Sequence, residues 1–214
     1  MEYREFYIPK LPHIQPLGGT SFVTTRLAGS LPQAQKVRLV DEYELRKRQV
    51  KAAFEIPHAK LDKLERLFFA KYEAITDKAE YGPVWLAQNP VADIVAQAFQ
   101  FWDVKKYDLI AYTIMSNHIH VVFTLNETDA QQPDIVLDRV MQSLKGYTAV
   151  ACNKRLKRSG AFWEHGSFDR MPRDRNELHR IVQYVLQNPV KAGLCSRWQD
   201  WQWTYIKPEY NDFD

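Results

Sequence analysis

Asn117-His118-Ile119-His120-Val121-Val122-Phe123 follows the apolar run 109–115 after a polar break at Ser116 and Asn117. Two runs rich in β-branched and aromatic residues around a polar pair predict two strands of a hairpin. Because successive side chains of a strand face opposite sides, His118 and His120 share one face, while Ile119, Val121 and Phe123 would pack on the core. Two imidazoles about 7 Å apart along a strand can converge on one metal ion. Such a pair can equally be structural, so the functional interpretation needs a partner elsewhere in the chain.

A helix predicted from about residue 175 to 188 offers that partner. Asp174 and Glu177 have the spacing of a capping box, and Pro189 disfavours helical geometry in the residue before it. Tyr184 and Asn188 are four residues apart and therefore neighbours on the helix surface. Both lie at the flank of an apolar stripe made of Leu178, Ile181, Val182, Val185 and Leu186. If the helix packs on the histidine face of the sheet, a phenol and an amide oxygen meet two imidazoles.

This combination of side chains has a chemical use. A metal ion held by two histidines and an amide oxygen can polarise a phosphodiester as a Lewis acid. A tyrosine phenolate can then attack phosphorus, release a 3′-hydroxyl and leave a 5′-phosphotyrosine that stores the bond for rejoining. The bland alternative is that Tyr184, one of 11 tyrosines, is a core-edge residue. Tyr147, on another predicted helix beside Lys145, is the second candidate nucleophile.

The rest of the chain predicts an α+β protein of one domain, residues 1–214. Residues 21–27 alternate as a strand, and residues 33–78 favour two helices interrupted near Pro57. Further helices are predicted from Pro90 and over 133–156. No apolar run approaches the roughly 18 residues of a membrane-spanning helix, and the start of the chain does not resemble a signal peptide, so we expect a cytoplasmic protein.

Charge gives only a local argument for nucleic acid. The net charge is +3, and Cys152 and Cys195 form no metal-binding or disulfide pattern. A basic cluster does follow the helix predicted over 133–156, and capping of its C-terminus explains one or two of those charges. We therefore predict a phosphate-contacting surface. Its residues are Arg26, Lys145, Lys154, Arg155, Lys157, Arg158, Arg170, Arg173 and Arg175.

Several segments resemble one known family. Residues 113–122 (TIMSNHIHVV) are similar to the MPNHxH signature of single-tyrosine HUH transposases, and residues 184–194 (YVLQNPVKAGL) resemble the YIxxNPVxAGL segment of their REP-associated branch. Segments 18–27, 162–164 and 167–170 agree as well. The resemblance runs in order from about residue 18 to 205. It departs at Ser116, where proline is usual, and at residues 33–80, a longer helical elaboration whose role the sequence does not reveal.

The resemblance implies a ferredoxin-like antiparallel sheet with helices packed on one face and the histidine motif on a central strand. It implies that His118, His120 and Asn188 bind Mg²⁺ or Mn²⁺ and that Tyr184 is the nucleophile. The implied activity is that of a metal-dependent single-stranded DNA endonuclease and strand transferase acting at REP-type hairpins, without ATP. We expect a monomer rather than a dimer. The alternatives are a hairpin-binding protein without catalysis and another HUH nickase, a replication initiator or relaxase.

Overall fold

Five antiparallel strands form the sheet that organises the protein. The computed structural model describes residues 18–52, 58–126 and 137–213, and the strand order is β4-β1-β3-β2-β5. The strands are β1 (Thr20–Arg26), β2 (Tyr107–Ile114), β3 (His118–Leu125), β4 (Phe168–Arg170) and β5 (Thr204–Ile206). Strand β3, which carries both histidines, pairs with β1 on one side and β2 on the other. The predicted α+β class, the β2–β3 hairpin and the central histidine strand are therefore confirmed.

Helices α3 (Asn89–Trp102) and α4 (Leu137–Arg155) cover one face of the sheet. With the strands they give the order β1-α3-β2-β3-α4-β4, the ferredoxin-like arrangement that the resemblance implied. Ile119, Val121 and Phe123 pack in this core, as the alternation of β3 predicts. Residues 133–136, where we expected α4 to begin, lie outside the described residues.

Helix α5 (Arg175–Lys191) covers the opposite face. Its buried Val182, Val185 and Leu186 pack against Phe22 and Val122 of the sheet. The expectation that helices lie on one face therefore holds for α3 and α4 but not for the whole protein. The reason is that part of this second face is also apolar, since Phe22 of β1, Ile110 of β2 and Val122 of β3 need a covering layer.

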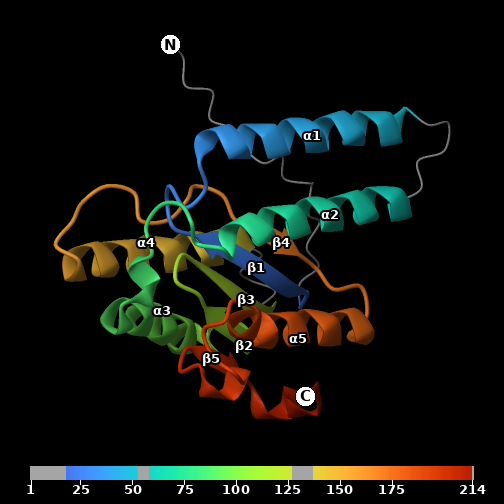
Figure 1. The fold of residues 1–214 in the computed structure, drawn as a ribbon. Helices are drawn as coiled ribbons and strands as arrows, with labels where there is room; N and C mark the ends of the chain where they lie inside the picture. Colours follow the sequence, from blue (N-terminus) through green and yellow to red (C-terminus); the bar gives the residue numbers. More distant parts are fainter. Residues whose placement is uncertain (1–17, 53–57, 127–136, 214) are drawn as a thin grey trace.

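A helical hairpin, α1 (Gln33–Lys51) and α2 (His58–Thr76), lies over the same side of the sheet as α5. Figure 1 shows the two helices side by side, with α1 outermost. Leu39 and Val40 of α1 pack with Phe68 and Tyr72 of α2 in a small core of their own. Phe69 of α2 reaches the sheet core beneath α5. Two separate helices, one of the possibilities that the sequence left open, are found here, while Pro57 itself lies outside the described residues; the end of α2 is brought onto the histidine face.

The start of α5 is fixed by the predicted capping box. The Asp174 carboxylate accepts a hydrogen bond from the Glu177 backbone N–H at 2.7 Å. The predicted end of the helix near Asn188 is wrong, since α5 continues to Lys191 with Pro189 inside it. Pro189 lies in the last turn, where its missing N–H costs a single intrahelical bond, and the Asn188 carbonyl still accepts from Ala192 N–H at 3.0 Å. Asn188 therefore stays one full helical turn from Tyr184.

Glu177 ties α5 to β4. Its carboxylate accepts from Arg173 Nε at 2.8 Å and Arg173 N–H at 3.0 Å, and it pairs with Arg170 of β4. Burial opposes ionisation of Glu177, but the hydrogen bonds from Arg173 and the charge of Arg170 lower its pKa to about 2. The ionised carboxylate is therefore a stabilising feature of the folded protein, because the unfolded chain binds its proton more tightly.

We expect Glu177→Gln to lower the free energy of unfolding at pH 7 by about 1–3 kcal/mol. Because the folded pKa lies below the ordinary 4.5, the contribution of Glu177 is complete above pH 4.5 and is lost as the pH falls toward 2. Denaturant titrations at pH 7 and pH 3 measure this, and the difference between wild type and variant should shrink at pH 3. Glu80→Gln, at an exposed position, is the control; equal loss at both pH values would contradict the electrostatic explanation.

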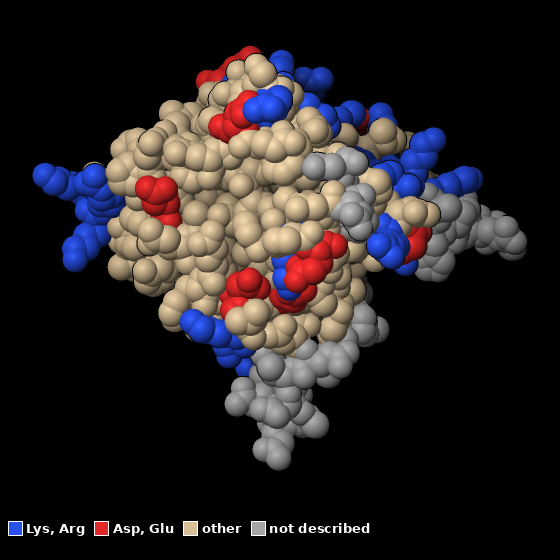
Figure 2. Space-filling view, turned by 90° about the horizontal axis from the view of Figure 1, so that it is seen from below, with Lys and Arg blue, Asp and Glu red and all other residues tan. Residues whose placement is uncertain are grey.

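Charged side chains are unevenly spread over the one face of the protein that Figure 2 shows. No helix within the described ranges is long and apolar enough to cross a membrane. Figure 2 shows the face on the side of the C-terminal segment, where the middle is largely uncharged and lysines and arginines gather toward the rim. A nucleic-acid surface must therefore be located residue by residue.

Candidate functional site

The two histidines of β3 meet at one point on the face covered by α2 and α5. His118 Nε2 lies 3.0 Å from His120 Nε2, and both side chains are fully buried. Thr24 of β1, which pairs with His120 across the sheet, places its hydroxyl 2.8 Å from His120 Nδ1. At least one of these two imidazole nitrogens can present an unprotonated lone pair. Two such nitrogens this close together can bind one metal ion.

Asn117 fixes the tautomer of His118. The Asn117 amide nitrogen donates to the Thr76 carbonyl at 2.9 Å, so its Oδ1 is the atom that lies 2.7 Å from His118 Nδ1. That oxygen accepts the Nδ1–H and leaves the Nε2 lone pair of His118 pointing into the site. Burial lowers the pKa of His118 and favours the neutral ring. Asn117 is thus the kind of outer partner that orients a metal-binding histidine.

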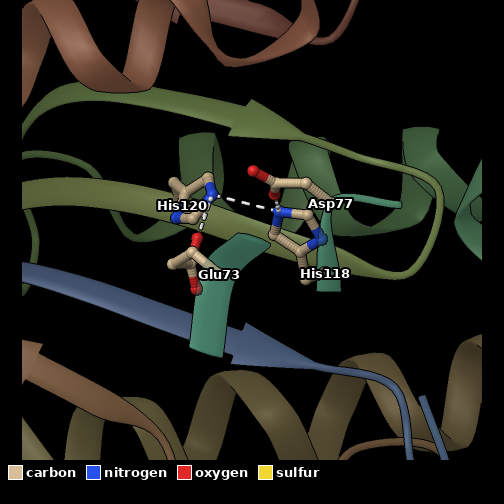
Figure 3. Close-up of side chains that lie close together, drawn as sticks. All are labelled: Glu73, Asp77, His118 and His120. Carbon is tan, nitrogen blue, oxygen red and sulfur yellow. Dashed lines mark hydrogen bonds and ion pairs between the residues drawn. The ribbon is translucent and has the colours of Figure 1, made fainter. Parts of the chain in front are cut away.

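Two carboxylates from the end of α2 complete the cluster. Glu73 Oε2 lies 3.1 Å from His120 Nε2, and Asp77 Oδ1 lies 3.3 Å from His118 Nε2. One ligand atom from each of the four residues lies within 4.8 Å of every other. Figure 3 shows the two histidine side chains pointing from β3 toward Glu73 and Asp77. The helical hairpin is therefore part of the site.

Sequence reasoning missed both carboxylates. Glu73 and Asp77 are one helical turn apart, and Glu73 follows Phe69 by four residues on the face that meets the sheet. Two acidic residues continuing a packing face were the available signal, but in a segment so rich in charge they are easily taken for a solvated surface. Glu73 is only 3% exposed, so it does not belong to the solvated surface of the helix.

Tyr184 of α5 reaches the same cluster. Its hydroxyl donates to Glu73 Oε2 at 2.8 Å, and its ring lies 5.3 Å from that of His120, centroid to centroid. Burial, followed by the negative charge of Glu73, raises the pKa of the Tyr184 phenol above its usual range. The phenol is therefore held neutral and oriented while Glu73 is ionised.

Asn188 lies on the other side of His120. Its Nδ2 is 3.1 Å from His120 Nε2, while its Oδ1 is buried and has no hydrogen-bond partner among the described residues. Rotation of the amide by half a turn presents the oxygen to the site instead. The predicted set of His118, His120, Tyr184 and Asn188 is therefore brought together in one place.

The donor set suits a divalent cation. Besides the two imidazoles it offers carboxylate oxygens of Glu73 and Asp77, and Glu73 Oε1 is a second buried acceptor without a partner in the described chain. Buried acceptors without donors are costly, and a cation satisfies them. Imidazole and carboxylate ligands together fit Mn²⁺ and other first-row ions, and the carboxylates also fit Mg²⁺.

Comparison with known proteins finds a family match over part of the chain that carries this site. Residues 86–188 match the family model described as "Transposase IS200 like". The match covers just under half of the chain, and this segment is similar to the IS200-like transposase family. It contains both histidines, Tyr184 and Asn188, whereas Glu73 and Asp77 precede it. The carboxylates thus come from a part of the chain outside the matched IS200-like segment.

Two similar proteins were found. A REP-associated tyrosine transposase of Escherichia coli K12 is 28% identical over 97 residues, which cover 45% of this chain and 53% of the relative. The chain thus matches about half the length of that curated relative. A solved structure of a REP-associated tyrosine transposase bound to a REP hairpin superposes with a TM-score of 0.52 at 15% identity, covering 92% of this chain and 82% of that one. This structural likeness confirms the fold.

Tyr147, the second candidate nucleophile, is remote from the cluster of Glu73, Asp77, His118 and His120. It lies on α4, which packs on the sheet face opposite the histidines, and it is 62% exposed. Lys145, beside it, points inward. Its Nζ donates to the carbonyls of Glu164, His165 and Gly166 at 2.7, 3.2 and 3.0 Å, and burial lowers its pKa to about 8. Lys145 holds a loop in place.

The other predicted phosphate-contacting residues divide into two groups. Lys154, Arg155, Lys157 and Arg175 are exposed, and so is Arg173, although it also donates to Glu177. Arg158 stacks on Trp85 at 3.8 Å and donates to the Ala161 carbonyl, while Arg170 pairs with Glu177. Arg26 is buried beside the histidines. The exposed residues of the first group remain candidates for contacts to a DNA backbone.

Proposed function

We propose that this chain is a metal-dependent endonuclease and strand transferase for single-stranded DNA, acting next to REP-like hairpins through a 5′-phosphotyrosine at Tyr184. The observation that carries the proposal is the contact of the Tyr184 hydroxyl with Glu73 Oε2, 2.8 Å away, inside the cluster of two histidines and two carboxylates. A nucleophile and a cation site this close are the two components that the reaction requires. The DNA substrate is inferred from the family and from the relatives described above.

The proposed roles follow from the geometry. His118, His120 and Glu73 would hold Mg²⁺ or Mn²⁺, with Asp77 and Asn188 at its edge. A divalent ion bound there supplies Lewis acidity to the scissile phosphodiester and favours ionisation of a nearby phenol. Tyr184 attacks phosphorus as its proton leaves toward Glu73. The new bond joins the Tyr184 oxygen to phosphorus, and the bond from phosphorus to the 3′-oxygen breaks. That oxygen takes a proton from water, so the strand leaves with a 3′-hydroxyl.

We propose that one chain suffices for this chemistry. Tyr184 lies beside His120 of the same chain, with ring centroids 5.3 Å apart, so the nucleophile need not come from a second copy. Tyr184 is flanked by Gln183 and Val185 rather than by a second tyrosine, and the cluster of the described residues contains two histidines. These features favour the single-tyrosine reaction over that of a replication initiator or relaxase.

Covalent adduct formation tests the proposal. Single-stranded oligonucleotides from the DNA flanking the gene, containing its palindromes, are incubated with the protein and Mg²⁺ or Mn²⁺ and separated on a denaturing gel. We expect a protein–DNA adduct and a free 3′-hydroxyl strand, and EDTA should reduce both by at least about a hundredfold because the Lewis acid is removed. Tight hairpin binding without any adduct would contradict the enzyme and support a binding protein.

A further inference from the structure

Arg26 is a buried cation in the wall of the site. It is the last residue of β1 and pairs directly with His118 across the sheet, as Thr24 pairs with His120. Since Thr24 bonds to the His120 ring, the alternation of β1 puts Arg26 on the same face as both histidines. The Arg26 residue is 8% exposed. A guanidinium therefore lies next to the proposed reaction centre and almost out of contact with water.

The hydrogen-bonding capacity of Arg26 is not used up. Its guanidinium carbon lies 3.9 Å from the centroid of the Tyr72 ring, and this contact with the ring face uses none of the N–H donors of the fork. Its Nε has no hydrogen-bond partner among the described residues. Burial lowers the pKa of Arg26 to about 10, so the group stays charged at neutral pH. A buried charged donor without an acceptor is unfavourable unless an anion joins it.

The nearby carboxylates do not fill this need. Glu164 influences Arg26 through its charge but is paired with Lys36. Glu73 bonds to Tyr184 and faces His120. If Glu73 and Asp77 balance the two charges of a divalent ion, the single charge of Arg26 remains. A phosphodiester carries one negative charge and presents two non-bridging oxygens, which match a planar guanidinium.

We propose that Arg26 binds a non-bridging oxygen of the scissile phosphodiester, beside His118. This inference rests on the proposed function and adds a residue to it. A positive charge placed there before the reaction stabilises the negative charge that accumulates on phosphate oxygens during phosphoryl transfer. It also holds the phosphate against His118 and His120, within reach of the Tyr184 hydroxyl.

Neutral-linkage scanning tests the proposal. Binding is measured by fluorescence anisotropy, with Mg²⁺, for the Tyr184→Phe chain and a hairpin oligonucleotide in which one phosphodiester at a time is replaced by a methylphosphonate. We expect one linkage at which replacement weakens binding by about tenfold or more, the usual effect of a lost hydrogen bond to a charged group. Adding Arg26→Gln should weaken binding of the unmodified DNA by a similar factor and abolish the penalty at that linkage. Arg180→Gln, exposed on α5, is the control and should change neither.

If the sensitive linkage shows the same loss of binding in the Arg26→Gln chain as in the chain with Arg26, the inference is overturned. If thermal unfolding shows that this variant does not fold, Arg26→Lys serves instead. It keeps the charge but not the planar fork, so the penalty should fall by at least about threefold, and an unchanged penalty would overturn the inference. The adduct assay on the wild-type chain runs in parallel. An adduct with an Arg26-independent penalty contradicts only the role of Arg26, and an Arg26-dependent linkage without an adduct contradicts only the nuclease.

Discussion

Tyr184→Phe is expected to abolish the covalent protein–DNA adduct, with a fall of at least about a thousandfold in its rate of formation. The substitution removes one oxygen, the atom that would attack phosphorus, and leaves the ring that packs at the edge of the sheet core. The hydrogen bond to Glu73 is lost, but Glu73 keeps its contact with His120. Denaturing gels of reactions with Mn²⁺, quantified against time, measure the effect.

Tyr147→Phe is the matched control for this experiment. It makes the same chemical change on α4, on the sheet face opposite the histidines, and should leave adduct formation unchanged. Hairpin binding by the Tyr184→Phe chain should also stay within about threefold of wild type, since the phenol forms one contact among many. An adduct that still forms in Tyr184→Phe would show that Tyr184 is not the nucleophile. It would not contradict the cation site.

The local part of the site could be predicted from the sequence. His118 and His120 share a face through the two-residue period of a strand, and Tyr184 and Asn188 share a flank through the four-residue neighbours of a helix. Each pair needs only local geometry, and the apolar stripes beside them specify which face each element buries. The packing of α5 on the histidine face then follows from matching the two apolar surfaces.

The contribution of α2 could not be predicted in this way. Glu73 and Asp77 meet His118 and His120 only because the α1–α2 hairpin packs over the sheet and α2 ends there. Nothing in the spacing of the two carboxylates specifies that long-range packing. The sequence also does not reveal which basic residues have partners within the protein. Lys145 and Arg170 were predicted to contact phosphates, but they bond to oxygens of the protein itself.

Glu73→Gln is expected to weaken Mn²⁺ binding by about tenfold to a hundredfold, the range typical for loss of a partner at a metal site. The amide keeps the size of the side chain, and its oxygen in the place of Oε2 can still accept from the Tyr184 hydroxyl and from a His120 Nε2–H in the metal-free protein. The fold should therefore be retained, and the loss should come from the missing charge. Titration calorimetry with Mn²⁺ and thermal unfolding without metal separate the two effects.

The same variant distinguishes two roles of Glu73 in the reaction. If Glu73 acts only by holding the cation, saturating Mn²⁺ should restore adduct formation; if its oxygen also takes up the phenol proton, formation should stay at least about tenfold slower at saturation. Glu80→Gln, exposed just beyond α2, is the control for the loss of one negative charge. Unchanged Mn²⁺ affinity in Glu73→Gln would remove Glu73 from the metal site and leave His118, His120, Asn188 and Asp77 as its candidate ligands. Glu73 lies outside the IS200-like segment. Weaker Mn²⁺ binding by Glu73→Gln would therefore mean that the helical hairpin supplies a metal ligand from outside that segment.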